Sequence, residues 1–228
     1  MEGRLFTFLG TIGGHGQEWI ILSHYVLVIG IIFLIARAAT RKLQLVPTGA
    51  QNVMETFVGG IITMGADTMG DKNARVYMPL IASLAIVIFV SNMMGVIPGF
   101  EAPTSNINFT LSLALIVFVY YNYLGIKTNG FINYFKHFMG PMPVLAPLMF
   151  PIEIISHISR IISLSFRLFG SIRGDDMFLM VLLMLVPWLL PFPGFFLLTA
   201  FGFLQAFIFS ILTYVYIAGS VMMEHEEH

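Results

Sequence analysis

The stretch FFLLTAFGFLQAFIFSILTYVYIAGSVM, residues 195–222, decides the fold class, because it contains no Asp, Glu, Lys, Arg or His over its whole length. A helix needs about 20 apolar residues to cross the roughly 30 Å hydrocarbon core of a bilayer. At about 1.5 Å per residue this stretch forms a helix of about 42 Å, which is too long to stand upright in that core. It therefore predicts a long, steeply tilted membrane helix.

The composition of the chain supports the same conclusion. Of its 228 residues 57% are hydrophobic and 10% are charged, whereas soluble domains carry roughly 25% charged residues. The net charge of −1 argues against a nucleic-acid partner, and the absence of cysteine excludes disulfides, iron–sulfur clusters and cysteine-bound zinc. We predict an all-α integral membrane protein.

The whole chain, 1–228, is expected to form a single membrane domain with about five spans. The expected elements are spans at 19–37, 78–98 and 107–126, a long charged helix at 144–190, and the final helix at 195–222. The segment Pro191-Phe-Pro-Gly194 is predicted to break the chain between the last two helices. Residues 46–69 are predicted to form an amphipathic helix on the inner membrane surface, and residues 131–139 are a second candidate.

Basic residues predict the orientation, because cytoplasmic loops are enriched in Lys and Arg. With the N-terminus outside and the C-terminus in the cytoplasm, the outer segments contain Arg4 alone. The inner loops and helix ends then hold Arg37, Arg41, Lys42, Lys72, Arg75, Lys127 and Lys136. Placement in a bacterial inner membrane follows from all-helical spans and a compact length.

The charged residues within 144–190 are unusual for a membrane segment. Glu153, Arg160 and Arg167 are spaced by seven, and His157 lies between the first two, so all four follow one helical stripe. An arginine at membrane depth costs at least about 2.5–3.5 kcal/mol. Arg167 is at the middle of this segment and has no acid at i±3 or i±4, so its counter-ion is expected from another chain.

Carboxylates lie on both sides of Arg167. Along a helix Glu153 is about 21 Å away toward the inner end, and Asp176 is about 13 Å away toward the outer end, next to Asp175. Such carboxylates are plausible entry and exit groups for an ion. Gln205 needs hydrogen-bond partners in hydrocarbon, and its contact with Arg167 requires a bend in the helix near Gly170–Gly174.

Structural alternatives exist for several of these polar groups. Arg160 and Arg173 are equally explained by snorkelling or by pairing with Glu153 and Asp176, and Asp175 by a solvated helix break. Asn92, Asn106 and Asn108 are predicted to be caps at outer span ends. The histidines form no convincing metal site, and we expect neither a metal nor a cofactor.

Four motifs, taken together, resemble the a subunit of the membrane sector of the rotary F-type ATP synthase. In chain order they are NMMGVIP (92–98), PTSNINFTLS (103–112), SLSFRLFGSIRGDD (163–176) and LQAFIFSILTYVY (204–216). The resemblance covers nearly the whole chain. It implies that the last two helices pack as a tilted hairpin against a partner ring of c subunits, with the b subunit and the rest of the complex as further partners.

The resemblance also implies roles for individual residues. Arg167 matches the essential arginine facing the ring, and Gln205 matches the glutamine near it. Glu153 matches the acid of the cytoplasmic half-channel and Asp176 that of the outer one, where Asp175 is a possible helper. The family's frequent asparagine is Ser171 here, and a histidine of some members is Leu198. Ser163 and His157 lie on the same charged helix and complete the candidate ion path.

The expected function is therefore that of a non-enzymatic stator channel. Two offset half-channels would lead protons to and from the ring carboxylates, and Arg167 would drive their deprotonation and block leakage. Sodium is not excluded as the ion, because the selective carboxylate would be on the ring. The main alternative is a secondary cation- or proton-coupled transporter, which would usually show an internal repeat. A membrane enzyme is disfavoured, because no catalytic constellation is present.

Overall fold

Helices make up most of the described chain, which in the computed structural model comprises residues 17–41, 43–130, 134, 146–185 and 191–221. The second amphipathic candidate, 131–139, lies outside these residues apart from Tyr134. The elements are α2 (Gln17–Thr40), α3 (Ala50–Met69), α4 (Asp71–Val96), the short 3₁₀ helix η1 (Pro103–Ser105), α5 (Ile107–Asn129), α7 (Ala146–Leu185) and α8 (Pro191–Val221).

The prediction of an all-α membrane protein is confirmed. Among the described residues, four helices are long and apolar enough to cross a membrane, namely α2, α4, α5 and α8. The fifth membrane helix expected from the sequence corresponds to α7. It has 40 residues and is therefore about 60 Å long.

Several helix boundaries differ from the expected ones because of proline and glycine. α3 begins at Ala50 rather than at 46, since Gly49 before it has a positive φ of 59°. α4 begins at Asp71 rather than at 78, directly after Gly70 with φ 80°. α8 begins at Pro191, so the predicted breaker forms its first turn. Proline is well tolerated there, because the first N–H groups of a helix have no intrahelical partner.

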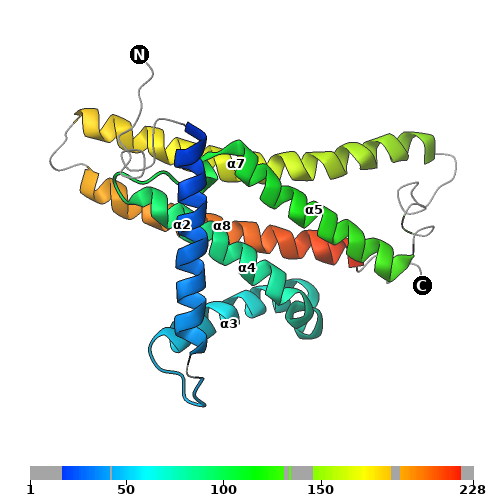
Figure 1. The fold of residues 1–228 in the computed structure, drawn as a ribbon. Coiled ribbons are helices and arrows are strands. Elements are labelled where there is room, and N and C mark those ends of the chain that lie inside the picture. Colours follow the sequence, from blue (N-terminus) through cyan, green and yellow to red (C-terminus); the bar gives the residue numbers. More distant parts are fainter. Residues whose placement is uncertain (1–16, 42, 131–133, 135–145, 186–190, 222–228) are drawn as a thin grey trace.

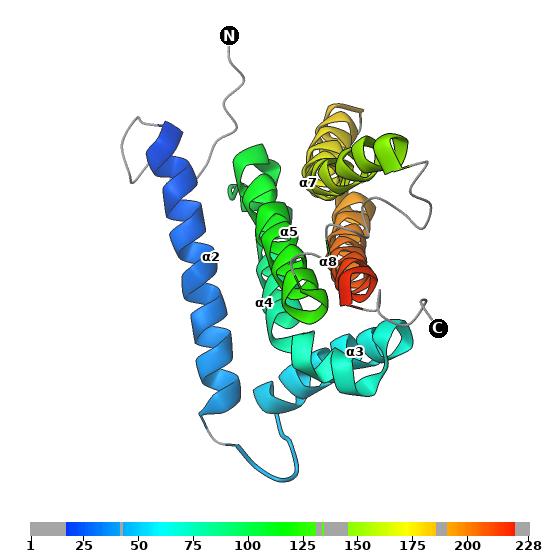
Figure 2. The same cartoon turned by 90° about the vertical axis from the view of Figure 1, so that its right-hand side faces the viewer.

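The helices run in two main directions (Figures 1 and 2). α2 runs vertically in both views, while α7 and α8 cross it steeply and lie beside each other. If α2 spans the bilayer upright, α7 and α8 are strongly tilted, as their lengths predict. α3 lies across the lower end of α2 (Figure 2), which is the arrangement expected of a helix at the membrane surface.

The core is formed where α4, α5, α7 and α8 meet, and it is filled by Ile81, Ile88, Val117, Leu168 and Phe209. Small residues allow close packing of membrane helices. A Cβ atom at Gly202 of α8 would be 3.2 Å from the Cβ of Asn92 on α4. This close approach brings polar groups of α4 and α8 together beside α7.

Candidate functional site

The helix α7 has one face packed in the protein and one face exposed. Leu164, Leu168 and Ile172, spaced by one helical turn, are buried against the other helices. Ile162, Phe166 and Arg167 lie on the outward face. A 40-residue helix can therefore offer a continuous surface to a partner while it remains anchored to the rest of the chain.

Arg167 makes no hydrogen bond or ion pair with any residue that the structure describes. Its side chain is on the exposed face among large apolar residues, and so is Ser163 one turn earlier. Ser171, one turn later, is half-buried. An arginine cannot be deprotonated at working pH, so its charge needs a partner when its surroundings are apolar. Within the described residues that partner is absent.

Near the N-terminal end of α7, its residues Glu153 and His157 join Tyr121 of α5. The Glu153 carboxylate (Oε1) lies 3.5 Å from Nε2 of His157, and Nδ1 of His157 is hydrogen-bonded to the Tyr121 hydroxyl at 2.9 Å. His157 and Tyr121 are buried, whereas Glu153 is half-exposed. The three groups thus lie in series, from a buried phenol through an imidazole to a half-exposed carboxylate.

Arg160 is held by an aromatic ring rather than by a carboxylate. Its guanidinium carbon lies 5.5 Å from the centre of the Tyr216 ring on α8, a cation–π contact. The possible pairings Glu153–Arg160 and Arg173–Asp176 do not form, although the structure describes all four residues. Arg160 thus connects α7 to α8, and the carboxylate of Glu153 remains available.

Toward the C-terminal end of α7, Asp175 and Asp176 line a small cavity between α7, α4 and α8. The cavity has a volume of about 10 Å³, and its wall includes Asn92, Leu198 and Gly202. This volume is near the smallest that accommodates one water molecule. The titratable groups among the described residues that line this cavity are the two aspartates.

Asn92 is a buried bridge between α4 and two other elements, not the loop cap that its position suggested. Its side-chain nitrogen donates to the carbonyl of Gly202 at 3.1 Å, and its oxygen accepts from the Thr104 hydroxyl at 2.7 Å. Asn106 does cap a helix, since its side chain accepts from the backbone N–H of Asn108. The Asn92 bonds thus hold α8, at Gly202, and η1, at Thr104, against α4.

Gln205 is buried, with 5% of its surface exposed, and its Nε2 has no hydrogen-bond partner among the described residues. No hydrogen bond joins it to Arg167. α7 changes direction near its middle (Figure 1), as the expected bend requires, but the two side chains stay unbonded. A buried amide with an unused donor is costly in an apolar environment, and it is a candidate for transient contact with water or a moving side chain.

Sequence reasoning identified the charged residues but not their partners. Tyr121 and Tyr216 were missed because a tyrosine in a membrane helix carries no signal of its own. A second missed contact is the bond of 3.1 Å between the hydroxyls of Thr110 and Ser165, which connects α5 to the buried face of α7. The described residues contain no group of three side chains suited to a metal ion.

Comparison with known proteins shows which protein family the chain is similar to. The family model described as ATP synthase A chain matches residues 20–218. The chain is 91% identical to the ATP synthase subunit a of Aliarcobacter butzleri, over the full length of both. It is 59% identical to that of a Nitratiruptor species, over 100% of this chain and 99% of the relative, and 57% identical to that of Helicobacter hepaticus, over 100% of both.

Proposed function

The chain belongs to the ATP synthase A chain family, a non-catalytic ion-channel component, and on this premise we propose how its residues carry protons past a rotating partner. Protons enter from outside through a half-channel that ends at Asp175 and Asp176. They leave toward the cytoplasm through a second half-channel at Glu153. Arg167 lies between the two and faces a ring of c subunits.

The direction of transfer follows from the cost of charge in hydrocarbon. A ring carboxylate that takes a proton near Asp176 becomes neutral and rotates through lipid, which its ionised form cannot do cheaply. After nearly a full turn it reaches the inner half-channel and releases the proton. Each elementary charge that crosses 100 mV supplies about 2.3 kcal/mol, and this free energy drives the rotation.

Arg167 favours the ionised form of the ring carboxylate. Two opposite unit charges about 4 Å apart attract each other by about 4 kcal/mol at an effective dielectric constant of 20. The same positive charge repels a proton that would pass directly from one half-channel to the other. Because arginine keeps its charge at working pH, it performs both tasks without titrating itself.

The inner half-channel uses the series of Glu153, His157 and Tyr121. The imidazole of His157 lies within reach of both neighbours, at 3.5 Å and 2.9 Å, so it positions the Glu153 carboxylate and passes protons toward it. Ser163 and Ser171 flank Arg167 at one helical turn on either side and offer hydroxyls to water or to the ring. Gln205, with its unused donor, steadies the arginine during rotation.

The remaining features of the proposal concern orientation and partners. The N-terminus is outside and the C-terminus is in the cytoplasm of a bacterial cell with an inner membrane. The exposed apolar face of α7 contacts the c ring, and a b subunit and the rest of the ATP synthase hold the chain still. The ion is a proton, with Na⁺ as the alternative that the ring carboxylate would decide.

The observation that carries the proposal is the position of Arg167. It has no partner among the described residues, it lies on an exposed apolar face, and titratable groups lie on both sides of it along α7. A stabilising charge would instead be paired within the chain, as Arg160 is with Tyr216.

The two half-channels are tested separately with Glu153→Gln and Asp176→Asn in the whole complex. Both substitutions keep the shape of the side chain and remove its ability to ionise. We expect ATP-driven proton pumping in membrane vesicles to slow severalfold in each variant, without a passive leak. Normal pumping in both variants would contradict the proposed path, and Asp67→Asn, at an exposed position on α3, serves as the matched control.

A further inference from the structure

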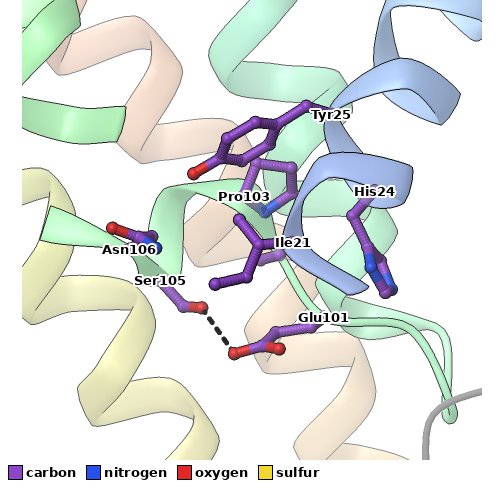
Figure 3. A pocket seen from close by; sticks show the side chains of 8 residues that line it. Ile21, His24, Tyr25, Glu101, Pro103, Ser105 and Asn106 are labelled. Atoms are coloured by element: carbon purple, nitrogen blue, oxygen red, sulfur yellow. Dashed lines mark hydrogen bonds between the residues drawn. The ribbon is translucent and has the colours of Figure 1, made fainter. Parts of the chain in front are cut away.

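A second cavity lies at the outer end of α2, away from α7 (Figure 3). Its volume is about 20 Å³, which is enough for at least one water molecule, and it is enclosed by the start of α2 and the loop that leads into η1. Two titratable side chains from different elements, His24 and Glu101, line it. Neither residue has a role in the path proposed above.

His24 is buried in an unusual state for a histidine. Only 2% of its surface is exposed, and its Nδ1 lies 2.7 Å from the backbone carbonyl of Ile20. A carbonyl oxygen only accepts hydrogen bonds, so the proton of the neutral ring is on Nδ1. Nε2 therefore has a free lone pair, and it has no hydrogen-bond partner among the described residues. The ring thus presents a buried base whose accepting nitrogen is unused.

Glu101 supplies the acid of the same cavity. Its side chain is half-buried, and its carboxylate accepts a hydrogen bond from the Ser105 hydroxyl at 3.4 Å (Figure 3). Tyr25, the third titratable group in the lining, stacks on Phe109 with 5.1 Å between the ring centres. Among the described residues that line the cavity with His24, Glu101 is thus the acidic one.

The helix η1 has contacts with residues of both this cavity and the one that Asp175 and Asp176 line. Ser105 faces Glu101 on one side of η1, while the Thr104 hydroxyl donates to Asn92 on the other. Asn92 lines the aspartate cavity, and a Cβ added to Gly95 of its wall would be 2.6 Å from the Cβ of Ala102. The adjacent residues Thr104 and Ser105 thus place one hydroxyl in the lining of the first cavity and the other on Asn92, which lines the second.

We propose that His24 and Glu101 form a proton-accepting site at the outer mouth of the path. Nε2 of His24 takes a proton from hydronium and releases water, and the proton then moves to the Glu101 carboxylate. From there it passes by way of water and the hydroxyls of Ser105 and Thr104 to the aspartate cavity, and each donor returns to its starting state. This inference rests on the proposed function, because it supplies protons to Asp176.

The first test replaces the two groups in the whole complex, reconstituted in vesicles that synthesise ATP from an imposed proton gradient. His24→Gln and Glu101→Gln keep the size of the side chains and remove proton exchange. We expect a severalfold loss of ATP synthesis that grows as the outer pH rises, because capture of scarce protons then limits the rate. Ser23→Ala is the control, since Ser23 bonds to the carbonyl of Ile20 in its own helix.

The outcomes separate this proposal from the one it rests on. Both glutamine variants could synthesise ATP at the wild-type rate at every outer pH while Asp176→Asn remains slow. That result would overturn the proposed proton-accepting site and leave the proposed outer half-channel intact. Rates equal to wild type in Asp176→Asn as well would overturn the outer half-channel itself. A loss in the glutamine variants that does not depend on outer pH would also contradict a role in proton capture.

The second test is a chemical probe of access. The chain has no cysteine, so Glu101→Cys introduces a single thiol into it. A membrane-impermeant, cationic methanethiosulfonate added from outside is expected to modify this thiol and to slow proton flux further. Leu22→Cys is the matched control: Leu22 lies near His24 on α2 with 49% of its surface exposed, and it is not in the lining of the cavity. Absence of labelling at position 101, or equal inhibition in both variants, would overturn the proposal.

Discussion

Tyr121 is the residue whose role is least visible in the sequence and most specific in the structure. Its hydroxyl group bonds to His157 on α7, and its ring lies 6.2 Å from that of Tyr216 on α8. It thereby connects the helix that carries Arg167 to both of its neighbours. A hydrogen bond between membrane helices contributes about 0.6 kcal/mol on average. We therefore expect the bond from Tyr121 to matter more for the position of His157 than for the stability of the protein.

We predict that Tyr121→Phe slows ATP-driven proton pumping while the complex still assembles. The phenylalanine keeps the ring and removes the bond of 2.9 Å to His157, which is then no longer held beside Glu153. The measurement is the initial pumping rate in membrane vesicles. Tyr120→Phe is the control, because Tyr120 is half-buried and makes no hydrogen bond to the described residues. Equal rates in the two variants would show that the hydroxyl of Tyr121 has no part in the path.

Asn92 holds α4, α8 and η1 together through two buried hydrogen bonds. We predict that Asn92→Leu lowers the thermal stability of the assembled complex, because Thr104 and the carbonyl of Gly202 both lose a partner in a buried site. The expected cost is about 1–3 kcal/mol, the range for burying an unsatisfied polar group. Asn108→Ala, at an exposed side chain, is expected to have no such effect. A melting temperature unchanged in Asn92→Leu would contradict the bridging role.

For single residues, the sequence shows which charged side chains are functional candidates, but it does not show which side chains they contact. An ionised group in a hydrocarbon environment is energetically costly, so Arg167, Glu153 and Asp176 stand out in the sequence as functional candidates. The partners of His157 and Asn92 could not be predicted, since they depend on how α4, α5 and α7 cross, and no local pattern encodes a crossing. Asn92 shows this clearly: its position at a span end suggested a cap, and the tertiary structure makes it a bridge.

Among the elements, α3 owes its position to one glycine. A Cβ atom added to Gly65 would lie 2.5 Å from the ring of Tyr214 on α8 and 2.9 Å from the Cβ of Ala74 on α4. Gly59 and Gly60 of the same helix have nothing within 4 Å of such an atom. The contact of α3 with α4 and α8 is therefore close at Gly65, whereas Gly59 and Gly60 are on an open face of the helix.

We predict that Gly65→Ala weakens this contact and lowers the yield of assembled complex, since a ring and a neighbouring helix must shift to admit one methyl group. Gly60→Ala is a suitable comparison, because alanine favours a helix over glycine by about 1 kcal/mol and meets no neighbour there. The measurement is the amount of complex recovered from membranes for each variant. A yield for Gly65→Ala as high as for Gly60→Ala would contradict the packing described.

The elements themselves were largely predictable. Apolar length alone identified the membrane helices, and the excess length of the last two predicted their tilt. The errors are at the ends: α4 begins at Asp71 and α8 at Pro191, where the polar or proline-containing segments continue the helix instead of ending it. A proline in the first turn of a helix costs no hydrogen bond. The segment 191–194, which was predicted to break the chain, therefore forms the beginning of α8.

For the whole molecule, the tilt of α7 and α8 and the exposed apolar face of α7 belong together. A membrane protein complete in itself would place Arg167 inside, among groups that neutralise it. This chain places it outside, on a surface that an adjacent partner must cover. The family membership identifies the rest of an ATP synthase as that partner assembly. This geometry agrees with the proposed function, in which the chain is a stator that holds two proton paths and one fixed charge beside a moving ring.

The most direct test of the role of Arg167 is ATP-driven proton pumping in vesicles that carry the whole complex, comparing wild type with Arg167→Ala and with Arg75→Ala. Arg75 is an exposed arginine near the N-terminal end of α4, outside the proposed path. We predict that Arg167→Ala abolishes pumping while the complex remains assembled, and that its membrane sector becomes leaky to protons once the soluble part is stripped. Full pumping by Arg167→Ala would contradict the proposed mechanism and leave Arg167 with a structural role only.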